Sequence, residues 1–331
     1  MKQAKTQAAS RRFSHEVYLY ASRRLRIIYL LATLAGLVIF GSLISRDFLS
    51  VSNFVNISVR VSFLLMMSIG MTLVIVSGGI DLSIVSVAVF SQILVAIILR
   101  DWGEEAFPIA ILAAIGLGMI IGLINGVIVA RLKVNPFIVT MSTMAIVRSL
   151  AEIVTGNNVI FGLPASFIQG FGAGKVWIFP ILTLIPIIAV IGTQFLLNST
   201  RFGSNVRGVG ANYSAAKYLG IRADSLRVLI FVLSGMFAGI AGLMIASRTG
   251  SANPGVMPQG TELDAIAAPV IGGATFRGGE GSVLGTAVGA IIIGMIANLL
   301  VLLGVEPHFQ QVVSGLIILG AVVSSGSEQI K

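Results

Sequence analysis

The sequence contains no cysteine, only two histidines and few charged residues, which make up 11% of its 331 positions. Without cysteine there is no disulfide, no thiol nucleophile and no thiolate metal ligand. Soluble domains carry about 25% charged residues, so this chain has too little polar surface to cover a water-soluble globule of its size. The G-x-x-x-x-G-K-[ST] loop that binds nucleotide phosphates is also absent. We therefore predict neither an enzyme active site nor a bound cofactor in this chain.

What the sequence has in abundance is apolar residues, at 56% of the chain. A membrane-spanning helix needs roughly 20 consecutive apolar residues. Nine such runs are present, and a shorter tenth run covers 263–274. We predict an all-α polytopic membrane protein of about ten transmembrane helices, whose first apolar run is retained rather than cleaved as a signal peptide. The nine runs are 27–44, 54–76, 82–99, 107–130, 136–155, 177–197, 228–247, 283–303 and 309–323.

The formal net charge of +9 is concentrated in two segments. Residues 1–26 hold seven basic residues against one acidic residue, and residues 201–227 hold five against Asp224. Basic segments beside apolar runs are typical of cytoplasmic loops, and the lack of interleaved aromatic residues argues against nucleic-acid binding. We predict a cytoplasmic N-terminal segment 1–26, one transmembrane domain 27–323 with a cytoplasmic loop 198–227, and a tail 324–331, with both termini cytoplasmic.

The same charge pattern bears on the short run 263–274. If this run enters the membrane as a short or broken helix, Arg277 returns to the basic side. Glycines spaced by four residues, such as Gly118 with Gly122 and Gly235 with Gly239, are predicted to allow close contact between helices.

Two segments, 74–83 and 269–285, share an order of apolar run, Gly-Gly pair and new apolar run. Broken helices in transporters often lie beside the transport path, although a short match can also arise by chance. Asp81 follows the first Gly-Gly pair. We interpret it as a helix cap that accepts the N–H group of Ser83 or Ile84, the alternative being direct contact with substrate.

Other polar groups fall inside the predicted spans. Arg148 and Glu152 are four residues apart and are predicted to pair, whereas Glu262 and Asp264 open the short run, where negative charge suits a helix N-terminus. Dispersed neutral polar groups suit the passage of a neutral polar solute, the alternative being hydrogen bonds between helices. The candidates for the translocation path are Thr72, Asp81, Gln92, Asn125, Asn135, Thr140, Ser142 and Asn298.

The loop 198–227 contains the pattern of a short helix. Asn212 is a suitable N-cap and Gly220 a suitable stop. A short helix between two spans, small on one face and surrounded by basic residues, suits docking into the groove of a partner protein, the alternative being an ordinary solvated turn. Its candidate docking residues are Asn212, Tyr213, Ala215, Ala216, Lys217, Leu219 and Gly220.

This loop and five further blocks, matched in their order along the chain, resemble the permease subunits of ribose/xylose/galactose-type ABC importers. The resemblance extends from about residue 50 to about residue 320. The blocks are residues 70–83 (GMTLVIVSGGIDLS), 122–126 (GLING) with 135–140 (NPFIVT), 262–273 (ELDAIAAPVIGG), 281–286 (GSVLGT) and 309–315 (FQQVVSG).

The resemblance implies a fold similar to the vitamin B12-type import permeases and a place in the bacterial inner membrane. It implies three kinds of partner: a cytoplasmic ABC ATPase subunit that binds the ATP, a periplasmic or lipid-anchored sugar-binding protein, and a second permease copy, identical or paralogous. The helix 212–220 would then sit in the ATPase cleft. The implied substrate is a ribose-like monosaccharide, with a polyol or the sugar-like autoinducer-2 still open.

A second class of function is an ion-coupled secondary transporter of a small polar solute. Such a transporter needs coupling carboxylates at a midplane cavity, for which Asp81, Glu152 or Asp264 are available. It would not need a basic docking helix, so the ABC permease is the favoured interpretation.

Overall fold

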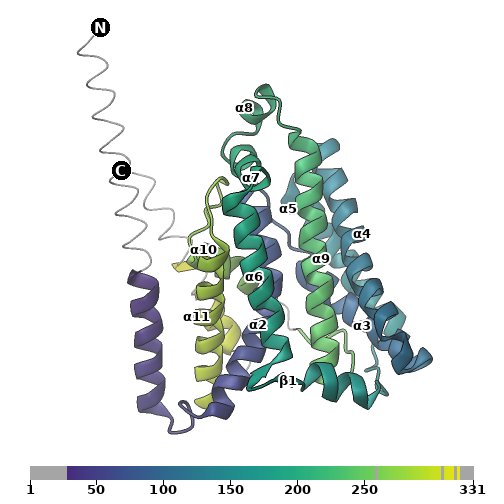
Figure 1. The fold of residues 1–331 in the computed structure, drawn as a ribbon, viewed down its shortest axis with the longest axis vertical. Coiled ribbons are helices and arrows are strands. Elements are labelled where there is room, and N and C mark those ends of the chain that lie inside the picture. The colour runs from purple at the N-terminus through teal and green to yellow at the C-terminus, as the bar shows by residue number, and fades with distance from the viewer. Residues whose placement is uncertain (1–27, 258–259, 307–308, 317–318, 321–331) are drawn as a thin grey trace.

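The computed structural model describes residues 28–257, 260–306, 309–316 and 319–320. The predicted segments 1–26 and 324–331 lie outside the described residues. Helices run side by side along the long axis of the molecule, with α7 and α8 at one end and β1 at the other (Figure 1). In chain order the elements are a helix Ile28–Ile44, α2 (Val51–Val76), α3 (Ile84–Trp102), η1 (Glu104–Ala106), α4 (Phe107–Arg131), α5 (Pro136–Thr155), η2 (Phe167–Gly172), β1 (Lys175–Val176), β2 (Phe179–Pro180), α6 (Ile181–Ser199), α7 (Arg201–Ala211), α8 (Tyr213–Tyr218), α9 (Ala223–Thr249), α10 (Thr261–Ile271), α11 (Val283–Leu302) and helical residues within 309–320.

Seven helices in the described part of the chain are long and apolar enough to cross a membrane, namely α2, α3, α4, α5, α6, α9 and α11. The all-α polytopic class is therefore confirmed, whereas the total of about ten spans and the likeness to the vitamin B12-type fold stay predictions. The run 309–323 is only partly described.

The predicted start of the sixth span at Trp177 is wrong. Trp177 lies in the turn of the β1–β2 hairpin with a φ of 58°, and Pro180 caps α6 with extended backbone, so the helix begins at Ile181. Apolar character alone did not distinguish this hairpin from the helix that follows it.

The most extensive contact between two helices in the described part of the chain joins α4 and α9, and α9 also packs against α2 and α3. The glycine spacing explains how closely α4 and α9 approach each other. A methyl group added to Gly118 would lie 2.0 Å from the carbonyl oxygen of Gly235, and one added to Gly235 would lie 1.9 Å from that of Gly118. The two backbones thus touch directly, and the predicted close approach is confirmed.

The helix α10 is short, with 11 residues, and packs on α11. At about 1.5 Å per residue it covers roughly half of a hydrocarbon core of about 30 Å. Arg277 follows it, and the next residue, Gly278, lies against the backbone of Gly210 in α7. The short helix and the return of Arg277 to the basic end are therefore confirmed.

The repeated Gly-Gly pattern corresponds to two structural breaks. After α2 the chain turns at Gly78, with a φ of 83°, and after α10 it turns at Gly273, with a φ of 102°. Both values lie in the left-handed region that glycine adopts at low cost. Each break leads into a new long helix, α3 or α11, so the predicted echo between the two segments exists in the structure.

Candidate functional site

The predicted short helix is present as α8, at the basic end of the molecule (Figure 1). The Oδ1 atom of Asn212 accepts a hydrogen bond from the backbone N–H of Ala215 at 2.9 Å, which satisfies one of the free N–H groups of the first turn. The chain leaves the helix through Leu219 and then Gly220, whose φ is 81°. Both predicted ends are confirmed.

One side of α8 packs on the chain and the other faces outward. Ala216 is buried in a small apolar cluster with Val209 of α7 and Ala223 of α9, whereas Ala215 is exposed. Tyr218 and Leu219 are 92% and 82% exposed. The two alanines therefore do not form one docking face. The large apolar side chains exposed at the end of α8 are those of Tyr218 and Leu219, which we call the α8 tip.

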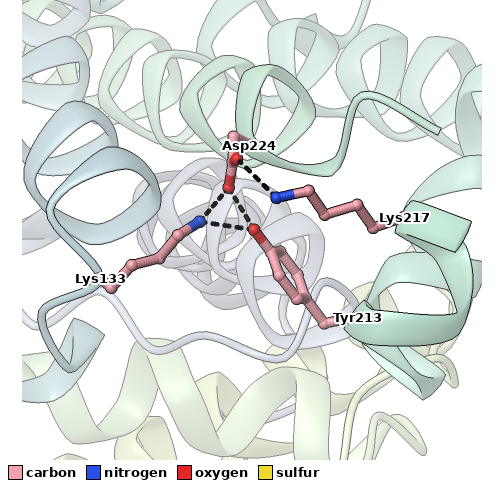
Figure 2. Close-up of polar contacts among 4 residues, drawn as sticks. All are labelled: Lys133, Tyr213, Lys217 and Asp224. Atoms are coloured by element: carbon pink, nitrogen blue, oxygen red, sulfur yellow. Dashed lines mark hydrogen bonds and ion pairs between the residues drawn. The ribbon is translucent and has the colours of Figure 1, made fainter. Parts of the chain in front are cut away.

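A polar cluster fixes α8 to its neighbours (Figure 2). The ammonium group of Lys133, from the loop between α4 and α5, donates to the hydroxyl oxygen of Tyr213 at 2.6 Å and pairs with Asp224 at the start of α9. The Tyr213 hydroxyl also donates to Asp224, and Lys217 lies 3.9 Å from the second oxygen of that carboxylate. We call these four residues the α8 clamp.

Cations also lie over the ring of Tyr213. The Lys133 ammonium is 4.9 Å and the Arg227 guanidinium 4.5 Å from the ring centroid, within the range of cation–π attraction. Desolvation lowers the pKa of Lys133, but the hydrogen bonds to Asp224 and Tyr213 outweigh it and leave that pKa above its ordinary value. Lys133 therefore stays charged at neutral pH.

Lys133 and Asp224 are site residues that were not predicted from the sequence. One signal was available, because Asp224 is the only acidic residue among 201–227 and so is the natural partner for the cations around it. The helix α7, which begins directly after its N-cap residue Thr200, was not predicted either. Three glycines in this helix, Gly203, Gly208 and Gly210, argue against a helix on propensity alone.

A second cluster surrounds Asp81, in the break between α2 and α3. One carboxylate oxygen accepts from the backbone N–H of Ser83 at 3.1 Å and from its hydroxyl at 2.6 Å, and the other accepts from the hydroxyl of Ser234 in α9 at 2.8 Å. Asp81 is buried. The predicted contact with the N–H of Ser83 is therefore confirmed, although Ser83 rather than Asp81 occupies the N-cap position of α3. Three donors satisfy a carboxylate that would otherwise be costly to bury.

Asn125 of α4 extends this network. Its amide nitrogen donates to the Ser83 hydroxyl at 2.9 Å, and its amide oxygen accepts from Thr143 of α5 at 2.6 Å. Thr140 donates to the carbonyl of Ile80 at 3.3 Å. Three of the predicted path residues, Asp81, Asn125 and Thr140, are thus brought together around one helix break.

The other predicted path residues are dispersed. Thr72 bonds with Thr286 of α11 at 2.7 Å, and the Asn298 amide exchanges hydrogen bonds with that of Asn53. Gln92 is buried and donates to the carbonyl of Ser251 at 2.9 Å, while its own amide oxygen has no hydrogen-bond partner in the described part of the chain.

Two predicted path residues lie on exposed parts of α5. Asn135 caps that helix by accepting from the N–H of Phe137, and Ser142 bonds only to the carbonyl of Ile138. Both side chains therefore bond within their own helix rather than to the Asp81 network.

The predicted pair between Arg148 and Glu152 is wrong. Arg148 lies 3.6 Å from Glu262 at the start of α10 and donates to the carbonyl of Met257 at 3.3 Å, whereas Glu152 is exposed. The buried carboxylate of Glu262 is the better partner because little water competes for it. Among the described residues, no group of three or more His, Cys, Asp or Glu side chains could hold a metal ion.

The seven long apolar helices are those of a multi-pass membrane protein. Comparison with known proteins identifies the family: residues 53–322 match the permease component of the branched-chain amino acid transport system, and the chain belongs to this family. No solved structure matches.

Three curated relatives are similar over most of their length. The ribose import permease protein RbsC of Escherichia coli strain K12 is 34% identical over 302 residues, which cover 90% of this chain and 93% of RbsC. The Bacillus subtilis strain 168 protein of the same name is 37% identical over 288 residues, covering 87% of this chain and 88% of that one. The galactose/methyl galactoside import permease protein MglC of E. coli K12 is 38% identical over 306 residues, covering 86% and 90%.

Proposed function

We propose that this chain is the transmembrane permease subunit of an ATP-binding-cassette importer for a monosaccharide. The observation that carries the proposal is the α8 tip, in which Tyr218 and Leu219 stand exposed on a helix otherwise fixed by the α8 clamp. An exposed apolar tip on a fixed support suits insertion into the groove of another protein. Because the sequence has no nucleotide-binding loop, that partner is the separate ATPase subunit that binds and hydrolyses ATP.

The charge distribution gives the orientation. Basic residues gather at the end that carries α7 and α8, so this end faces the cytoplasm of a bacterial cell and the chain lies in its inner membrane. The end of α3, with Asp101, and η1, with Glu104 and Glu105, face the opposite side, where a periplasmic or lipid-anchored sugar-binding protein delivers the substrate. The exposed apolar faces of α4 and α5 contact lipid and a second permease copy.

The substrate class follows from the relatives, whose names include ribose, galactose and allose permeases, and from the polar interior. Hydroxyl and amide groups such as Thr72, Asn125 and Thr143 bond between helices in this structure, and they would meet a neutral sugar where those helix contacts open during transport. Against ion coupling stands Asp81, whose carboxylate oxygens already accept hydrogen bonds from Ser83 and Ser234.

To test the proposal, the complex of this chain with its ATPase and its binding protein is purified from the native membrane and reconstituted in proteoliposomes. Uptake of labelled D-ribose, D-galactose and D-allose is measured with ATP inside or outside, with L-leucine as the comparison solute. We expect uptake of at least one sugar only with ATP on the α8 side. Uptake by the chain alone, driven by a proton or sodium gradient, would replace the proposal with secondary transport.

A matched pair of variants tests the docking surface. Tyr218→Glu places a charge on the α8 tip, and Trp177→Glu places one on a residue 84% exposed at the opposite end of the molecule. Neither side chain is buried, so both variants are expected to fold. We expect Tyr218→Glu to lose the ATPase subunit on purification and Trp177→Glu to retain it. Equal retention by both would exclude the α8 tip as the docking surface.

A further inference from the structure

Three segments far apart in the sequence touch through their backbones just beneath α8. The backbone N–H of Gly279, in the break before α11, donates to the carbonyl oxygen of Val76, the last residue of α2, at 2.7 Å. Gly210 of α7 lies against both. A methyl group added to Gly210 would stand 1.9 Å from the Val76 oxygen and 2.6 Å from the Gly279 nitrogen. No side chain larger than hydrogen fits between these groups, and we call this contact the Gly210 joint.

Side chains of α6 and α7 reinforce the joint. Arg207 donates to the carbonyl oxygen of Gly279 at 3.5 Å. At the end of α6, the amide oxygen of Gln194 accepts from the backbone N–H groups of Val283 and Leu284, at 2.9 and 3.2 Å, and so satisfies the first turn of α11. The α6–α7 unit therefore holds both the break before α11 and the N-terminus of that helix.

The Gly210 joint is also connected to α8 by a very short segment of chain. Gly210 is in the last turn of α7, and Asn212 is the single residue between α7 and α8. Val209, the residue before Gly210, lies in a buried apolar cluster with Ala216 of α8 and Ala223 of α9. A displacement of α8 must therefore move α7, because close-packed contacts transmit strain rather than absorb it.

We propose that Gly210 is a positioning residue that joins the docking helix rigidly to both glycine breaks, so that α7, the end of α2 and the start of α11 move as one unit in the transport cycle. This inference rests on the proposed function, since it needs an ATPase that pulls on α8. The breaks are the segments between α2 and α3 and between α10 and α11, where helical hydrogen bonding is interrupted, so a pull from α7 changes the angle between helices most easily there.

The first test compares Gly210→Ala with Gly208→Ala. Both changes add one methyl group to α7, but at Gly208 the nearest atom, the Cδ1 of Ile221, is 3.8 Å away, which is ordinary contact. In the assembled complex we expect Gly210→Ala to keep ATP hydrolysis but to lower sugar uptake per ATP about tenfold, within the usual range of coupling between sites. Gly208→Ala is expected to match the unmodified protein. An unchanged uptake-to-hydrolysis ratio in Gly210→Ala would overturn the proposal.

The second test crosslinks α7 to the break before α11 with a disulfide. It tests whether the Gly210 joint moves as one unit even if the Gly210→Ala complex does not assemble. A Cβ atom at position 279 would lie 2.9 Å from that of Ala211, so a small shift allows a disulfide in the variant Ala211→Cys/Gly279→Cys. The unmodified sequence has no cysteine to interfere. If the joint moves as one body, uptake is the same after oxidation and after reduction. Loss of uptake on oxidation, restored by reductant, would show that the joint opens and would overturn the proposal.

The single variants Ala211→Cys and Gly279→Cys serve as controls, because Gly279 has a φ of 81° and any side chain there is strained. Measurements on the unmodified complex distinguish a failure of the proposed function from a failure of the Gly210 joint. If it shows no ATP-driven uptake, the proposed function fails. If it transports normally and Gly210→Ala does so equally well, only the joint is refuted.

Discussion

Lys133 and Asp224 are 91 residues apart in the sequence, yet the ammonium of one contacts the carboxylate of the other, with the Tyr213 hydroxyl bonded to both (Figure 2). The pair connects the loop between α4 and α5 to the start of α9, on either side of α8. The helix α8 is thus held at two levels: the α8 clamp fixes it to the loop between α4 and α5 and to α9, and the Gly210 joint connects it to α2 and α11.

The first prediction concerns the α8 clamp. Lys133→Met removes the cation, and because Lys133 and Asp224 are partly exposed, we expect a loss of about 1 kcal/mol or less in the free energy of unfolding. Sugar uptake per ATP is expected to fall several-fold, since α8 is no longer tied to the α4–α5 loop. The charge swap Lys133→Asp/Asp224→Lys should recover part of the uptake. A Lys133→Met complex that transports normally would show that the clamp is only structural.

The pH dependence of the clamp follows from the pKa of Lys133. That pKa is raised in the folded protein, so the stabilisation is complete below the ordinary value of 10.5 and is lost only as the pH rises through the folded value. We expect the difference in uptake between the unmodified protein and Lys133→Met to be the same at about pH 6 and about pH 8. A difference that disappears between these two values would identify another titrating group.

The second prediction concerns the contact of α4 with α9. Gly118→Ala forces a methyl group to within 2.0 Å of the Gly235 carbonyl, so the helices must separate, and we expect a loss of about 1–3 kcal/mol in unfolding free energy. Gly116 lies two residues earlier with nothing within 4 Å of its added methyl group, and Gly116→Ala is expected to be neutral or slightly stabilising. Denaturant titration in mixed micelles measures both. Equal stability of the two variants would contradict this packing.

The third prediction concerns the partner of Arg148. Glu262 is buried and Glu152 is exposed. Glu262→Ala leaves the guanidinium without its carboxylate and removes the acceptor for the N–H of Gly260, so we expect a loss of about 1–3 kcal/mol. Glu152→Ala is expected to change stability by less than about 0.5 kcal/mol. The reverse order of the two losses, measured by thermal unfolding in detergent, would restore the pairing suggested by the four-residue spacing.

Features determined by neighbouring residues could be predicted from the sequence. The helix α5 begins and ends where the apolar run does, Asn212 and Gly220 bound α8, and the glycines at 118 and 235 mark a helix contact. In each case the physical cause lies within one turn of the chain, as a cap, a stop or a missing side chain.

Partners chosen by tertiary packing could not be predicted in this way. Nothing local distinguishes Glu262 from Glu152 as the partner of Arg148, and Lys133 meets Tyr213 only because α4 and α9 pack together. The helix α7 was missed for a related reason. Its glycines weaken helix propensity, but Gly210 is needed for the backbone contact with Val76, so tertiary packing outweighs the local preference.

The last prediction concerns the buried network at Asp81. Ser234→Ala removes the hydroxyl that donates to the second carboxylate oxygen of Asp81, so the folded state carries a partly unsatisfied buried carboxylate. We expect a loss of about 1–3 kcal/mol in the free energy of unfolding. Ser142→Ala is the control, because that hydroxyl is exposed and bonds only within its own helix. In the double variant Asp81→Asn/Ser234→Ala the loss should be smaller than the sum of the two single losses, because the neutral amide costs less to leave unpaired than a carboxylate. Strict additivity in this cycle would show that Ser234 does not stabilise the charge of Asp81.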